Sequence, residues 1–276
     1  MTHPTSLPEL NSVLAEMVSG QRAILGNGLV GVYLQGSFAS GGWDQSSDVD
    51  WVAAIARPLT DAQVEALQAL AVRLFALPTT WAQHLEGSYI TVEALRRLGD
   101  TPQQHWYLDN GSVTMERSDH DNSRVVRWQL HEHGVTLYGP PIATLTDPVD
   151  PDDLRREVRA VFSDWAAAFT ADERISSRWY QQFVVISYCR MLQTMQEGGV
   201  YSKPAGVEWG LAHLDPSWHS LIRRAWRERQ EDIWAKVWQP ADPAEIAQTL
   251  AFVRYAVDLS DRLPANDANR ESRLCR

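Results

Sequence analysis

The sequence predicts an α/β (α+β) first domain followed by an all-helical second domain, and three observations support this prediction. Short apolar runs that fit β-strands alternate with helical patterns in the first part of the chain. A stretch rich in proline and aspartate, residues 138–151, then interrupts the regular patterns. Every periodic segment after it has helical spacing. We therefore expect domains at residues 1–149 and 150–263, and a polar tail at residues 264–276.

Composition and charge indicate a packed protein that does not bind nucleic acid. The 276 residues are 44% hydrophobic and 22% charged, and the formal net charge is -10. That charge argues against a phosphate-tracking surface and favours cationic or metal-bound partners. The two cysteines, Cys189 and Cys275, form no disulfide framework, which favours a reducing compartment. The first residues lack the order of a signal peptide, and no apolar run approaches the roughly 20 residues of a membrane helix, so we expect a cytoplasmic location without a membrane partner.

The first elements have clear signals. Apolar residues at helical spacing predict an opening helix that ends near Gly26. Residues 29–35 fit a buried strand, and Gly36 follows it. A turn with a short helix leads to a second strand that begins at Asp48. The order is therefore strand, turn with a short helix, strand.

A second helix and a third strand follow. Thr60 and Gln63 fit a capping box, and the apolar face that follows predicts a helix closed by Pro78. Residues 88–92 are rich in strand formers, and Glu86 precedes them. A third acidic residue is thus expected at the entrance of a strand.

The rest of the chain divides into an irregular part and a helical part. Residues 99–139 give mixed signals around an apolar segment at 125–130. Asp150 and Pro151 suit the cap and first turn of a helix. The predicted helices of the second domain cover about residues 152–169, 177–197, 205–213, 217–236 and 244–262.

Five residues of the first domain form a chemically coherent set. Gly36 after a strand lets the backbone approach a ligand, and Ser37 offers a hydroxyl and a free amide to a phosphate. Asp48 and Asp50 point to the same face of a strand, where two oxygen ligands can share Mg²⁺ with substrate phosphates. Glu86 can complete the metal site or accept a proton from an attacking hydroxyl.

Simpler interpretations of these residues exist. The two aspartates could be solvated acids at an exposed strand end, but the turn and the glutamate would then be coincidences. Glutamates before strands are commonly solvated, and Glu93 is the rival candidate for the general base.

The stretch "LQGSFASGGWDQSSDVDWV", together with Glu86, resembles the nucleotidyltransferase fold of the DNA polymerase β superfamily, whose pattern is Gly-Ser, a spacer, and Asp-hydrophobic-Asp-hydrophobic. Within that superfamily it most resembles the aminoglycoside adenylyltransferases of the streptomycin and spectinomycin type. The Gly-Gly and Ser before Asp48, the "LYGP" at residues 137–140 and the helical second domain support this. The resemblance implies a small mixed β-sheet flanked by helices, followed by a helical bundle that contributes to nucleotide and acceptor binding.

The resemblance also implies a role for each site residue. Asp48 and Asp50 would bind Mg²⁺, and Glu86 would act as the general base, a third metal ligand and a contact of the acceptor. ATP would be the co-substrate, contacted by Gly36, Ser37, Ser47, Arg190, Lys203 and Trp226.

Parts of this transfer depend on the resemblance alone or depart from it. Without it, Arg190 and Lys203 would be surface charges and Trp226, where the family has Tyr, a core residue. The family's streptomycin-stacking Trp falls near Arg117 and a drug-binding Asp near Tyr180. These departures argue against streptomycin.

Two further clusters have open interpretations. Glu116, Asp119 and Asp121 form an acidic run that could bind the ammonium groups of an acceptor, and a solvated loop explains it equally well. The sequence His131-Glu132-His133 suggests zinc only weakly, because further ligands are not evident, so no zinc is predicted.

The expected function is transfer of AMP from ATP to a hydroxyl of a small cationic acceptor such as an aminoglycoside, with release of pyrophosphate, by a monomer or small homo-oligomer. Antibiotic resistance would be the corresponding role. One alternative is nucleotidylation of a protein or RNA hydroxyl, although the acidic charge argues against RNA. Another is an antitoxin-like or ligand-sensing module that binds nucleotide without turnover, although such a module has no evident need for all three acids.

Overall fold

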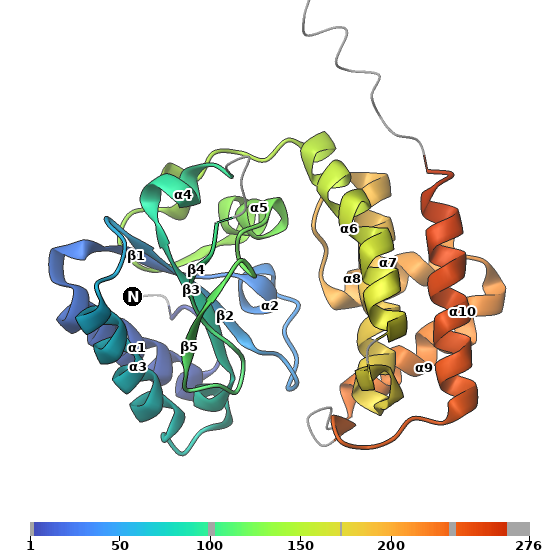
Figure 1. Cartoon of the computed structure of the whole chain (residues 1–276), viewed down its shortest axis with the longest axis horizontal. Coiled ribbons are helices and arrows are strands. Elements are labelled where there is room, and N and C mark those ends of the chain that lie inside the picture. The colour runs from blue at the N-terminus through green and yellow to red at the C-terminus, as the bar shows by residue number, and fades with distance from the viewer. Residues whose placement is uncertain (1–2, 99–102, 172, 232–235, 264–276) are drawn as a thin grey trace, which may run out of the picture. The chain divides into compact units, whose positions relative to one another are not determined.

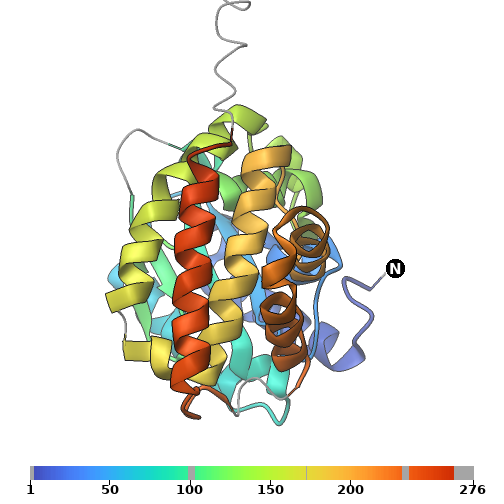
Figure 2. The ribbon, with the colours of Figure 1, turned by 90° about the vertical axis from the view of Figure 1, so that its right-hand side faces the viewer.

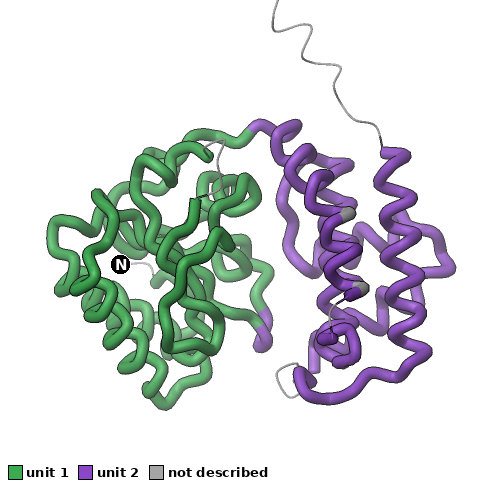
Figure 3. Tube along the Cα trace, in the orientation of Figure 1, with its two compact units in different colours: residues 1–43, 47–149 green, residues 44–46, 150–276 purple. Residues whose placement is uncertain are grey.

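The computed structural model describes residues 3–98, 103–171, 173–231 and 236–263 (Figure 1). Contacts between Cα atoms divide the chain into two compact units (Figure 3). The first contains residues 1–43 and 47–149, and the second contains residues 44–46 and 150–276. A mixed sheet with helices in the first unit and helices alone in the second confirm the predicted fold class.

The sheet of the first unit is mixed. Its strand order is β5-β4-β3-β2-β1-β6; β2 and β3 are parallel, whereas the other neighbours are antiparallel. The sequence predicted only the first three strands, because the other three are four residues long and lie in the irregular stretch. The strands are β1 (Leu29–Leu34), β2 (Val49–Ile55), β3 (Leu85–Thr91), β4 (His105–Leu108), β5 (Met115–Ser118) and β6 (Val135–Tyr138).

Helices cover both faces of this sheet (Figure 1). Side chains along β2 alternate between two apolar clusters: Trp51 packs in one, whereas Val52 packs in the other. Helices α1 and α3 cover the Trp51 face, and α4 and α5 cover the Val52 face. By this alternation Asp50 shares the face of Val52. The helices are α1 (Pro8–Leu25), α2 (Gly36–Ser40), α3 (Asp61–Phe75), α4 (Val92–Arg96) and α5 (Arg124–His133), with 3₁₀ turns at Gly26–Gly28, Thr80–His84 and Ile142–Thr144.

The first two predicted strands differ from β1 and β2 by one residue at an end, because Leu34 ends β1 and Val49 begins β2; the start of β3 differs more. Strand β3 begins at Leu85, so Glu86 lies inside the strand and not before it. The reason is pairing: β3 runs parallel to β2 in a continuous register that starts with Val49 opposite Leu85. The hydrogen bonds of a neighbouring strand therefore extend β3 into a segment whose own residues gave no strand signal.

The second unit is helical, as predicted. Helix α10 lies against α6 and α7 (Figure 2), and the rings of Phe162 and Tyr188 pack edge to face between α6 and α7. The predicted helix at 217–236 is shorter in the structure, and residues 232–235 lie outside the described residues, as does the predicted polar tail. The helices are α6 (Pro151–Ala171), α7 (Arg178–Glu197), α8 (Lys203–His213), α9 (His219–Gln230) and α10 (Pro243–Ser260), with 3₁₀ turns at Glu173–Ser176 and Pro216–Trp218.

A short segment of the first half of the sequence belongs to this helical unit. The guanidinium of Arg229 on α9 donates to Asp44 Oδ2 at 3.0 Å and to the backbone oxygen of Ser46 at 2.9 Å. Arg229 is buried, so these bonds satisfy a charge that would otherwise be costly to bury. None of the described helices is long and apolar enough to cross a bilayer.

The start of α3 has the capping box that the sequence predicts. Gln63 donates its backbone N–H to Thr60 Oγ1 at 3.3 Å, and Thr60 donates its own to Gln63 Oε1 at 3.0 Å. We expect Thr60→Ala to lower the free energy of unfolding by about 1 kcal/mol, since one helix-end donor loses its partner. Urea denaturation followed by circular dichroism measures this.

Val72→Ala on the same helix is the matched control for the capping variant. Val72 is 49% exposed, so its truncation removes little buried surface. Equal stability of Thr60→Ala and the wild-type protein would contradict a contribution of the box.

Candidate active site

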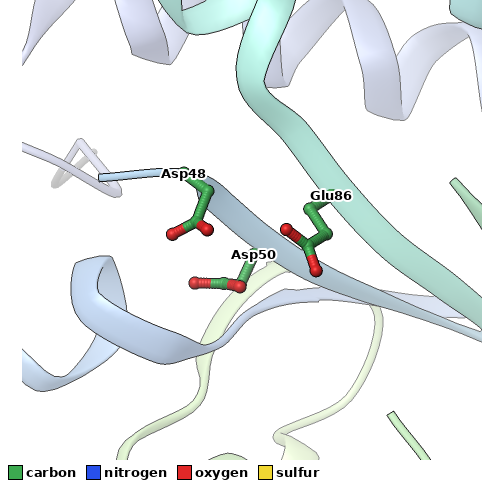
Figure 4. A group of neighbouring side chains, drawn as sticks. All are labelled: Asp48, Asp50 and Glu86. Atoms are coloured by element: carbon green, nitrogen blue, oxygen red, sulfur yellow. The ribbon is translucent and has the colours of Figure 1, made fainter. Parts of the chain in front are cut away.

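Three carboxylates converge at one end of the β2–β3 pair (Figure 4). Asp50 on β2 lies directly opposite Glu86 on β3 in the parallel register, and Asp48 precedes β2. One carboxylate oxygen from each of the three lies within 4.8 Å of the others. Within the described ranges this is the one group of three or more residues arranged to hold a metal ion.

The electrostatics of this cluster favour a cation. Glu86 is 8% exposed, and burial raises its pKa, with a further contribution from the charge of Asp48. A divalent cation would offset the repulsion between the carboxylates, and hard oxygen ligands suit Mg²⁺. The residues present therefore fit the predicted metal.

Glu86 is also held by two residues that the sequence analysis missed. Tyr107 on β4 donates its hydroxyl to Glu86 Oε1 at 2.6 Å, and His120 Nε2 lies 3.1 Å from the same oxygen. This hydrogen bond raises the pKa of His120 to about 9. No short-range pattern could have indicated these residues, because they reach Glu86 only through the pairing of β4 with β3 and of β5 with β4.

The Gly36 turn lies against the carboxylates. Gly36 opens α2 with φ 61°, and a Cβ at this position would overlap Oδ2 of Asp50. Glycine is thus required both by the left-handed backbone and by the space that Asp50 occupies. The hydroxyl oxygen of Ser37 is buried and has no hydrogen-bond partner among the described residues. Such an unpaired group is suited to an oxygen of a bound phosphate.

The remaining nucleotide candidates are placed as follows. Ser47 is buried immediately before Asp48. In the second unit, Arg190 lies on α7 and donates Nε to the backbone oxygen of Tyr201 at 2.7 Å. Lys203 is the first residue of α8, and Trp226 lies on α9. All three residues of the second unit are partly exposed, and their contacts with nucleotide stay predictions.

The acidic run does not form a single surface. Glu116 and Asp119 are exposed, whereas Asp121 is 4% exposed. The Asp121 carboxylate accepts hydrogen bonds from Ser88 Oγ at 2.6 Å and from Gln35 Nε2 at 2.9 Å. Asp121 is therefore not available to an acceptor, which corrects the expectation from sequence. The cause is that the loop after β5 turns this side chain inward, which sequence spacing cannot indicate.

Glu93, the rival candidate for the general base, lies apart from the carboxylate cluster. Glu93 is exposed and lies beyond the far end of β3, because Thr91 pairs with Ile55 while Glu86 pairs with Asp50. That separation makes Glu93 a poor candidate for the base.

At the positions where streptomycin-binding residues were expected, Arg117 lies over the ring of Trp106 and Tyr180 is buried.

Comparisons with known proteins agree with this architecture. Residues 144–255 match the family described as aminoglycoside adenylyltransferase, C-terminal domain. Spectinomycin 9-adenylyltransferases of Staphylococcus aureus strains Mu50 and N315 are each 24% identical to the chain over 227 residues, which is 76% of this chain and 83% of each relative.

A solved structure has the same fold. It is the crystal structure of spectinomycin adenyltransferase AAD(9) from Enterococcus faecialis with ATP and spectinomycin. Its TM-score is 0.67 at 16% sequence identity, and the match covers 90% of this chain and 98% of that chain. The predicted resemblance of this chain to the aminoglycoside adenylyltransferases is confirmed.

The overlap between a Gly36 side chain and Asp50 can be tested by cation binding. We expect Gly36→Ala to weaken Mn²⁺ binding, measured by electron paramagnetic resonance, by about tenfold or more, because the added methyl displaces a ligand. Gly41→Ala is the matched control, since Gly41 also has positive φ (75°) but a Cβ there would meet no atom within 4 Å. Equal Mn²⁺ affinity in the two variants would contradict the proposed contact.

Proposed function

We propose that this protein is a Mg²⁺-dependent adenylyltransferase that transfers AMP from ATP to a hydroxyl of an aminocyclitol antibiotic, spectinomycin, and releases pyrophosphate. The observation that carries the proposal is the convergence of Asp48, Asp50 and Glu86 beside the Gly36 turn. Nucleotidyl transfer needs a cation near the phosphates and a base near the acceptor, and this arrangement offers groups for both.

Asp48 and Asp50 are the proposed ligands of Mg²⁺, with an oxygen of Glu86 within reach as a third. When bound there, Mg²⁺ would neutralise charge on the phosphates of ATP. In the reaction, the acceptor oxygen forms a bond to the α-phosphorus while the bond from that phosphorus to the pyrophosphate oxygen breaks. The proton of the acceptor hydroxyl passes to the Glu86 carboxylate. Burial makes Glu86 a stronger base than an exposed glutamate, since it raises the pKa.

The turn that opens α2 is the proposed phosphate contact. The unpaired Ser37 hydroxyl and the close backbone at Gly36 would hold phosphate oxygens, and Ser47 would add a contact next to Asp48. In the second unit, Arg190 and Lys203 would contribute positive charge to nucleotide binding. Trp226 would offer an aromatic face to adenine.

The choice of acceptor is supported by charge and by the relatives. The net charge of -10 and the exposed carboxylates of Glu116 and Asp119 favour a cationic molecule. The relatives are named for spectinomycin. Streptomycin is disfavoured, because Arg117 and Tyr180 stand where the family's streptomycin-binding residues were expected.

The metal assignment predicts a simple loss of function. Asp50→Asn removes a ligand charge from the site, so we expect Mg²⁺-dependent pyrophosphate release to fall by at least about 100-fold with the fold retained. A coupled pyrophosphate assay measures the rate, and circular dichroism checks the fold. Asp61→Asn, an exposed residue on α3, is the control and keeps full activity. Wild-type activity in Asp50→Asn would refute the metal role of this residue.

The acceptor is tested with ATP labelled at the α-phosphate. We expect label in spectinomycin, with a mass increase of one adenylyl group, and no label in streptomycin. Chelation of Mg²⁺ abolishes the product, since the phosphate charge is then not neutralised. Label that enters protein or RNA from a cell extract instead would favour a macromolecular acceptor. Nucleotide binding by calorimetry without any labelled product would indicate a binding module.

A further inference from the structure

We propose that Tyr107 and His120 are positioning residues for Glu86: they hold one of its carboxylate oxygens in place and thereby keep the other oxygen available for the reaction. The inference deepens the proposed function and rests on it for the role of Glu86. It concerns two residues whose importance the sequence pattern does not indicate.

The first argument is the geometry around Glu86. The Tyr107 hydroxyl and His120 Nε2 both bond to Oε1, at 2.6 and 3.1 Å. No described residue donates a hydrogen bond to Oε2. Two donors on one oxygen restrict rotation of the carboxylate group, because any rotation that moves Oε1 breaks both bonds. Of the two bonds to Oε1, the one from Tyr107 is the shorter. The Tyr107 hydroxyl has a second acceptor, Asp109 Oδ1, but that oxygen is farther away at 3.0 Å, so the bond to Glu86 is the stronger of the two.

The second argument is that both donors are themselves held. The Tyr107 side chain is buried, and the His120 ring stacks on it with centroids 5.1 Å apart and planes inclined by 26°. The exposed fraction of the His120 side chain is 57%, so the stack and the bond to Glu86 are what order it. An exposed loop residue without such contacts would not hold a carboxylate in a single orientation.

The third argument is the anchor next to His120. Asp121 is buried and accepts hydrogen bonds from Ser88 on β3 and from Gln35, the residue after β1. The backbone N–H of Gln35 in turn donates to the backbone oxygen of Asp50 at 3.0 Å. The loop that carries His120 is therefore tied to the strands on both sides of β2, which carries Asp50. This gives the inward-facing Asp121 a structural role in place of the acceptor contact expected from sequence.

The effect on reaction rate follows from the need for orientation. A general base must lie within hydrogen-bond reach of the proton that it accepts, and a shift of about 1 Å can cost 100-fold in rate. The positioning residues act through Glu86 and touch neither substrate in this mechanism. Their loss should lower kcat and leave ATP binding intact.

Two of the test variants keep an aromatic ring at the substituted position, and a third keeps a donor in place of the ring. Tyr107→Phe and His120→Phe remove the donors to Glu86, the first together with the hydroxyl contact to Asp109, whereas His120→Gln retains an N–H donor. We expect about a 10- to 100-fold loss of kcat for the two Phe variants, with KM for ATP changed by less than about twofold, and partial rescue by His120→Gln. Tyr138→Phe removes a hydroxyl from β6 of the same sheet and is the control, with unchanged kcat.

A double-mutant cycle separates positioning from general damage. In a Glu86→Gln background, Tyr107→Phe should cause no further loss of kcat, since the group through which it acts is already disabled. An additive loss in the double variant would overturn the inference. So would wild-type kcat in both Phe variants.

A crystallographic readout does not depend on turnover. Crystal structures of the wild-type protein and Tyr107→Phe should differ in the orientation of the Glu86 carboxylate. An identical carboxylate in the two structures would overturn the inference even if the enzyme is inactive. Conversely, a wild-type protein that adenylylates no acceptor but shows the expected difference between the two structures would refute the proposed function and leave the positioning role supported.

Discussion

The parallel pairing of β2 with β3 is the constraint on which the site depends. Its register places Asp50 opposite Glu86 and so brings like charges together at one end of two central strands. Such an arrangement is costly unless a cation or hydrogen-bond donors compensate it. The apolar continuation of the same strands, with Trp51 on one face and Val52 on the other, packs into two cores that hold the register in place.

Two glycines leave room for the carboxylate cluster and for the paired strands. A side chain at Gly36 would overlap the Asp50 carboxylate, and one at Gly87 would overlap the backbone oxygen of Trp51. Gly36 contacts Asp50, and Gly87 follows Glu86, so a larger residue at either position would collide with atoms next to the carboxylate cluster. The result is a narrow set of allowed residues at the point where the proposed chemistry takes place. Because Gly87 has no side chain, β3 can approach β2 closely at the residue next to Glu86.

The support of Glu86 illustrates how a site extends beyond its reactive groups. Tyr107 comes from β4 and His120 from the loop after β5, and Asp121 links that loop to the strands on either side of β2. A carboxylate that serves as ligand or base needs a fixed orientation as well as a suitable pKa. The buried network fixes the orientation of the Glu86 carboxylate, and desolvation raises its pKa.

The sequence by itself determined the fold class and the helical second half, because these depend on local periodicity. It also indicated five site candidates, Gly36, Ser37, Asp48, Asp50 and Glu86, through turn chemistry, the Asp-x-Asp spacing and the family resemblance. Only the tertiary structure decided the short strands β4 to β6, the inclusion of Glu86 within β3, the donors Tyr107 and His120, and the burial of Asp121. Each of these depends on pairing between segments distant in sequence. Strand pairing stabilises residues whose own propensities are weak, and it alone selects which side chains meet.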